Sequence, residues 1–133
     1  MTRTVTIIGD GSMASVCALL LESQGAAVTI WGSAAEHIES LIQTRENQRY
    51  LPGYRLPESI QITADDQEAF THADLIVNAI PTQYIRQVWA RLAPHVPSEV
   101  GVVSVAKGIE VDTLLRPTQV IADVMQRTGD DPD

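Results

Sequence analysis

The sequence has 133 residues, 44% of them apolar and 20% charged, which is typical of one globular domain and not of a disordered chain. Nine Lys and Arg residues oppose 17 Asp and Glu residues, and the formal net charge of −8 argues against binding nucleic acid through a basic surface. The single cysteine excludes an intrachain disulfide, and we find neither a signal peptide nor an apolar run of the roughly 20 residues that a membrane helix needs. We therefore expect a cytoplasmic protein.

Apolar, β-branched runs alternate with segments in which apolar residues recur at helical spacing. The sequence predicts strands at residues 5–8, 26–31, 60–63, 74–80 and 100–105. It predicts helices at residues 13–24, after Ser33, and at 65–70, 85–92 and 118–127, followed by a polar tail at 129–133. Such alternation is typical of a parallel sheet with helices on both faces, so we predict a doubly wound, mostly parallel α/β fold.

Two local features carry further expectations. Ser33 and Glu36 have the spacing of a capping box, so Ser33 is expected to cap the second helix. Residues 45–59 are rich in proline, glycine and arginine, and are expected to form a long irregular loop with a functional role.

The first strand is followed by a glycine-rich turn that opens a helix. Residues 9–14 match the GxGxxG pattern with alanine in third place. Gly9 permits the tight turn, Gly11 lets the backbone approach a pyrophosphate, and Ala14 is small enough for close packing of helix and strand. The amides at the start of the helix then bind phosphates. This context predicts a Rossmann-like dinucleotide site, and the alternative is a glycine-rich turn that binds nothing.

The end of the second strand bears on the choice between NAD and NADP. Residues 31–36 read Trp-Gly-Ser-Ala-Ala-Glu, with neither an acid nor an arginine at the strand end. Ser33 could bind the ribose or its phosphate, or could serve only as a helix cap. The sequence therefore leans mildly toward accepting NADP. Trp31 is either core or a neighbour of the adenine.

Three further positions fall at strand ends on the same edge of the sheet. Gly9, Pro81 and Lys107 end the first, fourth and fifth strands, so they could border one crevice. Lys107 is suited to an anionic ligand, although its position alone favours a solvated lysine in a turn. Pro81 either stiffens the loop beside the site or simply terminates its strand.

Other chemistries are not supported by the sequence. The three histidines have no metal-ligand spacing with one another or with Cys17, which lies on an apolar helical stripe and is expected to be core. We find neither a Ser-His-Asp set nor a nucleophile elbow, and we assign no catalytic residue and no metal site.

Taken together, the motifs resemble the N-terminal domain of the bacterial NAD(P)-dependent glycerol-3-phosphate dehydrogenases. Two blocks are specific to that family: Tyr-Leu-Pro-Gly at 50–53 and Lys-Gly-Ile-Glu at 107–110. Three blocks accompany them in order, at residues 8–14, 28–32 and 73–81. The first specific block extends back to Asn47, and the resemblance covers almost the whole chain.

The resemblance implies a function and a set of site residues. The family reduces dihydroxyacetone phosphate reversibly to sn-glycerol 3-phosphate, which feeds phospholipid synthesis. Carried over by position, Ser12 and Met13 would contact the cofactor phosphates, and Ser33 the adenosine ribose. Tyr50 would contact the cofactor, and Lys107 both cofactor and substrate.

This sequence departs from the family's pattern at three positions, and a large part of the family's length is missing from it. Met13 replaces an aromatic residue, Ala14 a glycine, and Ser33 a basic residue, and the last change puts a strong NADP preference in doubt. The family's catalytic lysine, its substrate domain and the sixth strand of its sheet would all follow Asp133. We therefore expect residues 1–133 to be a dinucleotide-binding domain that turns over negligibly alone.

Alternatives remain at this point. The chain could be a non-catalytic NAD(P)(H)-sensing module, or the coenzyme domain of a ketopantoate-type or 2-hydroxyacid reductase, which the two specific blocks disfavour. Without a sixth strand the sheet edge is open and could pair with a second copy, so a homodimer is left open.

Overall fold

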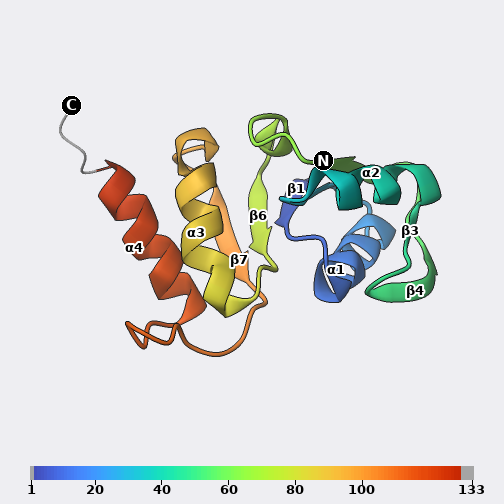
Figure 1. Ribbon diagram of the computed structural model, residues 1–133. Coiled ribbons are helices and arrows are strands. Elements are labelled where there is room, and N and C mark those ends of the chain that lie inside the picture. Colours follow the sequence, from blue (N-terminus) through green and yellow to red (C-terminus); the bar gives the residue numbers. More distant parts are fainter. Residues whose placement is uncertain (1, 130–133) are drawn as a thin grey trace.

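The computed structural model describes residues 2–129 (Figure 1). Its strands are β1 (Thr4–Ile8), β2 (Ala27–Trp31), β3 (Glu46–Asn47), β4 (Leu51–Arg55), β5 (Gln61–Thr63), β6 (Leu75–Asn78) and β7 (Gly101–Ser104). Its α-helices are α1 (Ser12–Ser23), α2 (Ala35–Thr44), α3 (Thr82–Leu92) and α4 (Pro117–Gly129), and short 3₁₀ turns lie at η1 (Glu68–Phe70) and η2 (Ala93–His95).

Five of the strands form one parallel sheet in the order β5-β2-β1-β6-β7. Ile8 at the end of β1 pairs with Trp31 of β2 on one side and with Asn78 of β6 on the other. The chain moves outward from β1 in both directions, so the switch in strand order lies beside β1, where doubly wound folds bind ligands. The predicted parallel, doubly wound α/β fold is confirmed.

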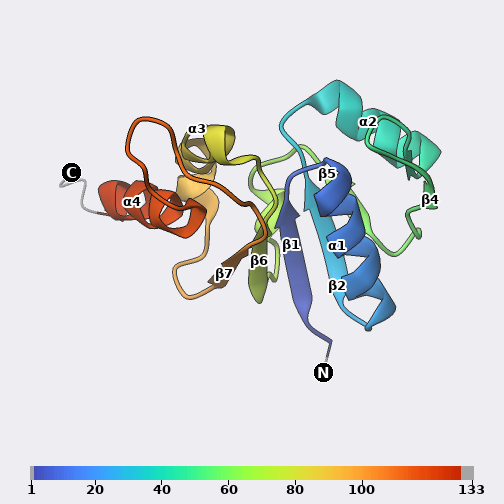
Figure 2. The same cartoon turned by 90° about the horizontal axis from the view of Figure 1, so that it is seen from below.

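The two faces of the sheet carry separate apolar cores because neighbouring residues of a strand point to opposite faces. Ile7 packs with the apolar sides of α1 and α2, whereas Ile8 packs with those of α3 and α4. Figure 2 shows α1 and α2 on one side of the molecule and α3 and α4 on the other. Helices α1 and α3 begin just after the carboxyl ends of β1 and β6. That edge of the sheet is therefore the expected place for a binding site.

The expected long loop at 45–59 is instead partly ordered as a small antiparallel sheet. β3 pairs with β4, with an irregularity in register between Glu46 and Asn47. Arg45 turns the chain in the left-handed conformation at φ 56° after α2, and its guanidinium donates 2.6 Å to the carbonyl oxygen of Ile60. These contacts tie the segment to the core and explain why its loop-like composition was misleading.

Two predicted helix details are also wrong. Ser33 does not cap α2, which begins after Ala34 without a side-chain cap from the described residues. The helix expected at 65–70 is only the short 3₁₀ turn η1: the Asp65 carboxylate accepts hydrogen bonds from the amides of Gln67 and Glu68 at its start, and the chain leaves the helical conformation at Thr71 and His72, the latter with φ 58°.

Two expectations fall beyond the described part of the chain. The polar tail lies outside it from residue 130 onward, and so does the predicted sixth strand after Asp133. Within residues 2–129, no helix has the length and apolar character to cross a membrane.

The burial of the central strand β1 predicts which substitutions lower the free energy of unfolding. We expect Ile7→Ala to lower the free energy of unfolding by about 2–5 kcal/mol, because Ile7 is fully buried and its loss leaves a cavity. Urea denaturation measures this change. Leu20→Ala is the matched control, because Leu20 is 62% exposed and its loss should change stability by less than about 0.5 kcal/mol. Equal losses of unfolding free energy in the two variants would contradict the burial of Ile7 in the core.

Candidate functional site

Two adjoining cavities lie at the carboxyl edge of the sheet. The larger, of about 540 Å³, lies between the ends of β6 and β7 and the start of α3. The smaller, of about 340 Å³, lies over the turn that follows β1. They share a wall made of Met13, Ala79, Ile80 and Pro81. The two cavities thus form one extended groove across the switch in strand order.

The turn after β1 depends on glycine at its first position. Gly9 has φ 131°, a conformation that side chains rarely adopt, and a Cβ atom there would lie 2.8 Å from the carbonyl oxygen of Ala79. The Gly9 amide donates to the carbonyl of Trp31 over 2.8 Å. Gly9 therefore brings the ends of β1, β2 and β6 close together.

Gly11 has a different role. Its backbone is extended, at φ −86° and ψ −164°, so glycine is not needed for the turn itself. A Cβ atom there would meet nothing within 4 Å beyond its chain neighbours. The missing side chain thus leaves open space directly over the start of α1.

The N-terminus of α1 offers amides to an anion. Ser12 and Met13 open the helix and are exposed, and no side chain of the described residues caps it. The first amides of a helix lack intrahelical acceptors and lie at the positive end of the helix dipole. With the open space at Gly11, this end is suited to a phosphate group.

Asn47 holds this turn from the side, a role that the sequence analysis did not assign. Its buried amide group donates to the carbonyl oxygen of Asp10 over 2.9 Å and to Ser15 Oγ over 3.0 Å. The small sheet β3–β4 therefore positions the glycine turn. The only signal in the sequence was that Asn47 begins the block that continues to Tyr-Leu-Pro-Gly.

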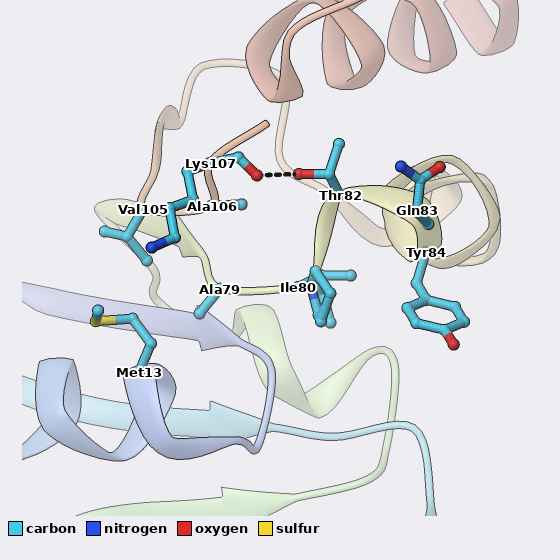
Figure 3. A pocket seen from close by; sticks show the side chains of 10 residues that line it. Met13, Ala79, Ile80, Thr82, Gln83, Tyr84, Val105, Ala106 and Lys107 are labelled. Atoms are coloured by element: carbon cyan, nitrogen blue, oxygen red, sulfur yellow. Dashed lines mark hydrogen bonds between the residues drawn. The ribbon is translucent and has the colours of Figure 1, made fainter. Parts of the chain in front are cut away.

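The loop after β7 is fastened to α3 along its length. Thr82 Oγ1 donates over 2.7 Å to the carbonyl oxygen of Lys107 (Figure 3), and Gln83 Nε2 donates to that of Ile109. Arg86 holds both carboxylate oxygens of Glu110, at 2.9 and 3.0 Å. Hydrogen bonds from Arg86 and Thr113 lower the pKa of Glu110. The Lys-Gly-Ile-Glu block is thus a loop with a fixed backbone.

Lys107 is the only lysine in the sequence, and it lines the larger cavity. Figure 3 shows its amino group directed into the cavity, toward the end of β6 at Ala79. Its side chain forms no ion pair with any carboxylate of residues 2–129. A cation is therefore available to an anionic group in the cavity.

The structure brings most of the predicted site residues together. The smaller cavity is lined by Gly9, Gly11, Ser12, Met13, Tyr50 and Pro81, and the larger by Met13, Pro81 and Lys107. Tyr50 directly precedes β4, and its ring makes an edge contact with the His37 ring, with 5.6 Å between the ring centres. Ser33 is exposed and lines neither cavity. Pro81 directly precedes α3, so it marks a helix start as well as a strand end.

Two expectations about the end of β2 are resolved. Trp31 is core: it is buried and its indole donates to Asp66. No acidic residue follows β2 directly in the sequence, but one lies close to this strand end in space. In space, the Asp10 carboxyl group lies directly against Gly32.

Residues 2–129 contain no group of three or more His, Cys, Asp and Glu side chains that could hold a metal ion. Burial raises the pKa of the half-buried Cys17 thiol, which disfavours the reactive thiolate.

The groove fits a dinucleotide whose pyrophosphate lies at the glycine turn. It offers an open helix N-terminus, a turn without side-chain bulk at Gly11, and the cation of Lys107. Fold and site together define a dinucleotide-binding α/β domain of the Rossmann type. The chain belongs to the family described as the NAD-dependent glycerol-3-phosphate dehydrogenase N-terminus, whose sequence model matches residues 4–130. The resemblance drawn from the sequence blocks is confirmed.

Curated relatives of the chain are named glycerol-3-phosphate dehydrogenases. It is 39% identical over 121 residues to a glycerol-3-phosphate dehydrogenase (NAD(P)+) of Syntrophomonas wolfei, covering 91% of this chain and 35% of that protein. It is 41% identical over 132 residues to a second such enzyme of Mycobacterium tuberculosis, covering 99% of this chain and 39% of that protein. The chain therefore spans little more than a third of the length of these relatives.

Solved structures agree on the fold. Glycerol-3-phosphate dehydrogenase from Coxiella burnetii matches with a TM-score of 0.86 at 24% identity, over 93% of this chain and 38% of that one. The enzyme from Saccharomyces cerevisiae matches with a TM-score of 0.80 at 24% identity, over 95% of this chain and 40% of that one.

The anchoring role of Asn47 is testable. Asn47→Ala should lower the free energy of unfolding by about 1–3 kcal/mol, because it leaves buried polar atoms of the turn without their partner. Urea denaturation measures the loss. Gln48→Ala, at the exposed neighbouring position, is the control. A Gln48→Ala loss as large as that of Asn47→Ala would contradict the anchoring role.

The Arg86–Glu110 pair predicts a dependence on pH. The pKa of Glu110 is lowered from its ordinary 4.5, so its stabilisation is present above that pH and is lost as the pH falls through the folded-state pKa. The difference in unfolding free energy between wild type and Glu110→Gln should therefore be largest at pH about 7 and shrink at pH about 3.5.

Asp66 does not confound this comparison. A hydrogen bond from Arg91 also lowers the pKa of Asp66, but that contribution is common to both chains. Urea denaturation at both pH values supplies the data. A difference that stays constant or grows on acidification would contradict the pairing.

Proposed function

We propose that this chain is the NAD(P)-binding domain of an sn-glycerol-3-phosphate dehydrogenase. In this proposal the complete enzyme transfers a hydride from NAD(P)H to dihydroxyacetone phosphate, giving sn-glycerol 3-phosphate for phospholipid synthesis. The observation that carries the proposal is the single groove that joins the glycine turn to Lys107. The names of the relatives, which match over nearly the whole chain, supply the reaction.

In the proposal, residues of this domain bind the dinucleotide and orient it in the groove. In the proposal, the pyrophosphate lies over Gly9 and Gly11 and accepts hydrogen bonds from the amides of Ser12 and Met13. Tyr50 closes the side of the groove near the turn, and Pro81 forms the wall shared by both cavities. Ser33, exposed after β2, faces the adenosine end.

Lys107 has a separate role in the larger cavity. Its ammonium group stands where the proposal places the reacting end of the cofactor, so it contacts both the cofactor and the substrate phosphate. The fixed backbone of its loop limits the entropy lost when the side chain engages an anion. The dinucleotide, when bound, supplies the hydride.

No residue of this domain is assigned as the general acid or base. Reduction of a carbonyl needs a positioned proton donor, and in the proposal that group comes from the part of the relatives' length that this chain does not span. The chain alone is therefore proposed to bind dinucleotide with negligible turnover. We also propose a cytoplasmic location and no interaction with nucleic acid, while a homodimer stays an open alternative.

Gly11→Val tests the proposal. We expect the wild-type chain to enhance or shift the fluorescence of NADH on titration, and the variant to lose this binding at least tenfold. The valine fills the space over the α1 N-terminus, while the extended backbone of Gly11 accepts it without strain.

The control is Gly101→Val, at the start of β7. A Cβ atom at Gly101 would meet only Leu75 Cδ1, at 3.8 Å, so a valine there fits equally well but lies away from the turn. Both variants should keep the wild-type circular dichroism spectrum. A folded Gly11→Val chain with wild-type affinity would remove the proposed cofactor site.

A further inference from the structure

The Asp10 carboxyl group stands in the place from which a side chain on residue 32 would begin. A Cβ atom on Gly32 would collide with Asp10 Oδ2, and would lie 2.9 Å from Asp10 Cγ and 2.6 Å from Ile38 Cδ1. Gly32 directly follows β2, and Asp10 lies in the turn after the neighbouring strand β1. The close approach is therefore set by the pairing of two strands, with Ile8 beside Trp31.

That place has a defined chemistry in dinucleotide-binding folds. An acid at the end of the second strand, about 20 residues beyond the glycine turn, accepts hydrogen bonds from the ribose hydroxyls of NAD. The same negative charge repels the additional 2′-phosphate of NADP. Here residue 32 is glycine and supplies no side chain, but the carboxylate of Asp10 fills the vacated position and also lines the smaller cavity.

The charged neighbours of Asp10 define what surrounds this carboxylate. Burial raises the pKa of Asp10, while the positive charges of His37 on α2 and Arg49 between β3 and β4 act in the opposite direction. His37 Nε2 lies 3.3 Å from the Asp10 carbonyl oxygen, and the Arg49 guanidinium lies 5.1 Å from the Tyr50 ring centre. The basic side chains of His37 and Arg49 are thus the charged neighbours of the Asp10 carboxyl group.

We infer that Asp10 is the residue that selects NAD(H) over NADP(H) in this domain, by accepting the adenosine ribose hydroxyls at the position normally served by a strand-end acid. This inference rests on the proposed function. It also reverses the mild preference for NADP that the sequence around Ser33 suggested, because the acid comes from a different turn.

These neighbours make the effect of removing the carboxylate specific. Without the charge of Asp10, the guanidinium of Arg49 would be unopposed and would attract a 2′-phosphate. Neutralising Asp10 should therefore tighten NADPH binding more than it weakens NADH binding, since an amide oxygen still accepts a hydrogen bond from a hydroxyl.

The experiment compares dissociation constants of NADH and NADPH for the 133-residue chain by fluorescence titration. We expect wild type to bind NADH at least tenfold more tightly than NADPH, and Asp10→Asn to reduce this ratio at least fivefold. Glu39→Gln, which removes the same charge from an exposed position on α2, should keep the wild-type ratio. Asp10→Ser provides a second neutral variant, and circular dichroism checks the fold of each chain.

The outcomes separate this inference from the function beneath it. A ratio unchanged in both folded Asp10 variants, or a wild-type chain that prefers NADPH, would overturn the assignment of Asp10 while leaving dinucleotide binding intact. A wild-type chain that binds neither cofactor would overturn the proposed function and this inference with it.

Discussion

The chain leaves β1 and enters α1 through three residues, and Gly9 is the residue that permits this turn. Its φ of 131° and its contact with the backbone of Ala79 leave no room for a side chain. The same turn places the first amides of α1 over the end of the sheet and sends Asp10 toward the neighbouring strand. The proposed binding of the pyrophosphate and the proposed recognition of the ribose therefore depend on one backbone conformation.

Two networks hold the groove open on either side of this turn. Asn47 fastens the glycine turn from β3, and the hydrogen bonds from Thr82, Gln83 and Arg86 fasten the loop that carries Lys107. Both networks join segments far apart in the sequence. These residues hold the backbone of the two loops, while the exposed side chains between them are free to contact a ligand.

The apolar runs were sufficient to predict the five parallel strands, because the inner strands are buried on both faces and continuously apolar, and the edge strand β7 keeps two valines although it is partly exposed. The glycine turn was predictable because the spacing of its small residues follows directly from the backbone geometry of a tight strand-to-helix turn. The sheet β3–β4 was missed because Pro52 and Gly53 dominate its composition, while Asn47 and Arg45 supply tertiary contacts that no local pattern encodes. The meeting of Asp10 with Gly32 depends on strand register, so it could be seen only in three dimensions.

The central claim is that the carboxyl edge of the sheet binds a dinucleotide, and amide chemical shifts of the isotope-labelled chain during NADH titration test it most directly. The account predicts the largest shifts at residues 9–13 and around Lys107. A third cavity, at the opposite edge and lined in part by Thr4, Thr29 and His72, provides the internal comparison. Shifts concentrated there, with the glycine turn unchanged, would contradict the account.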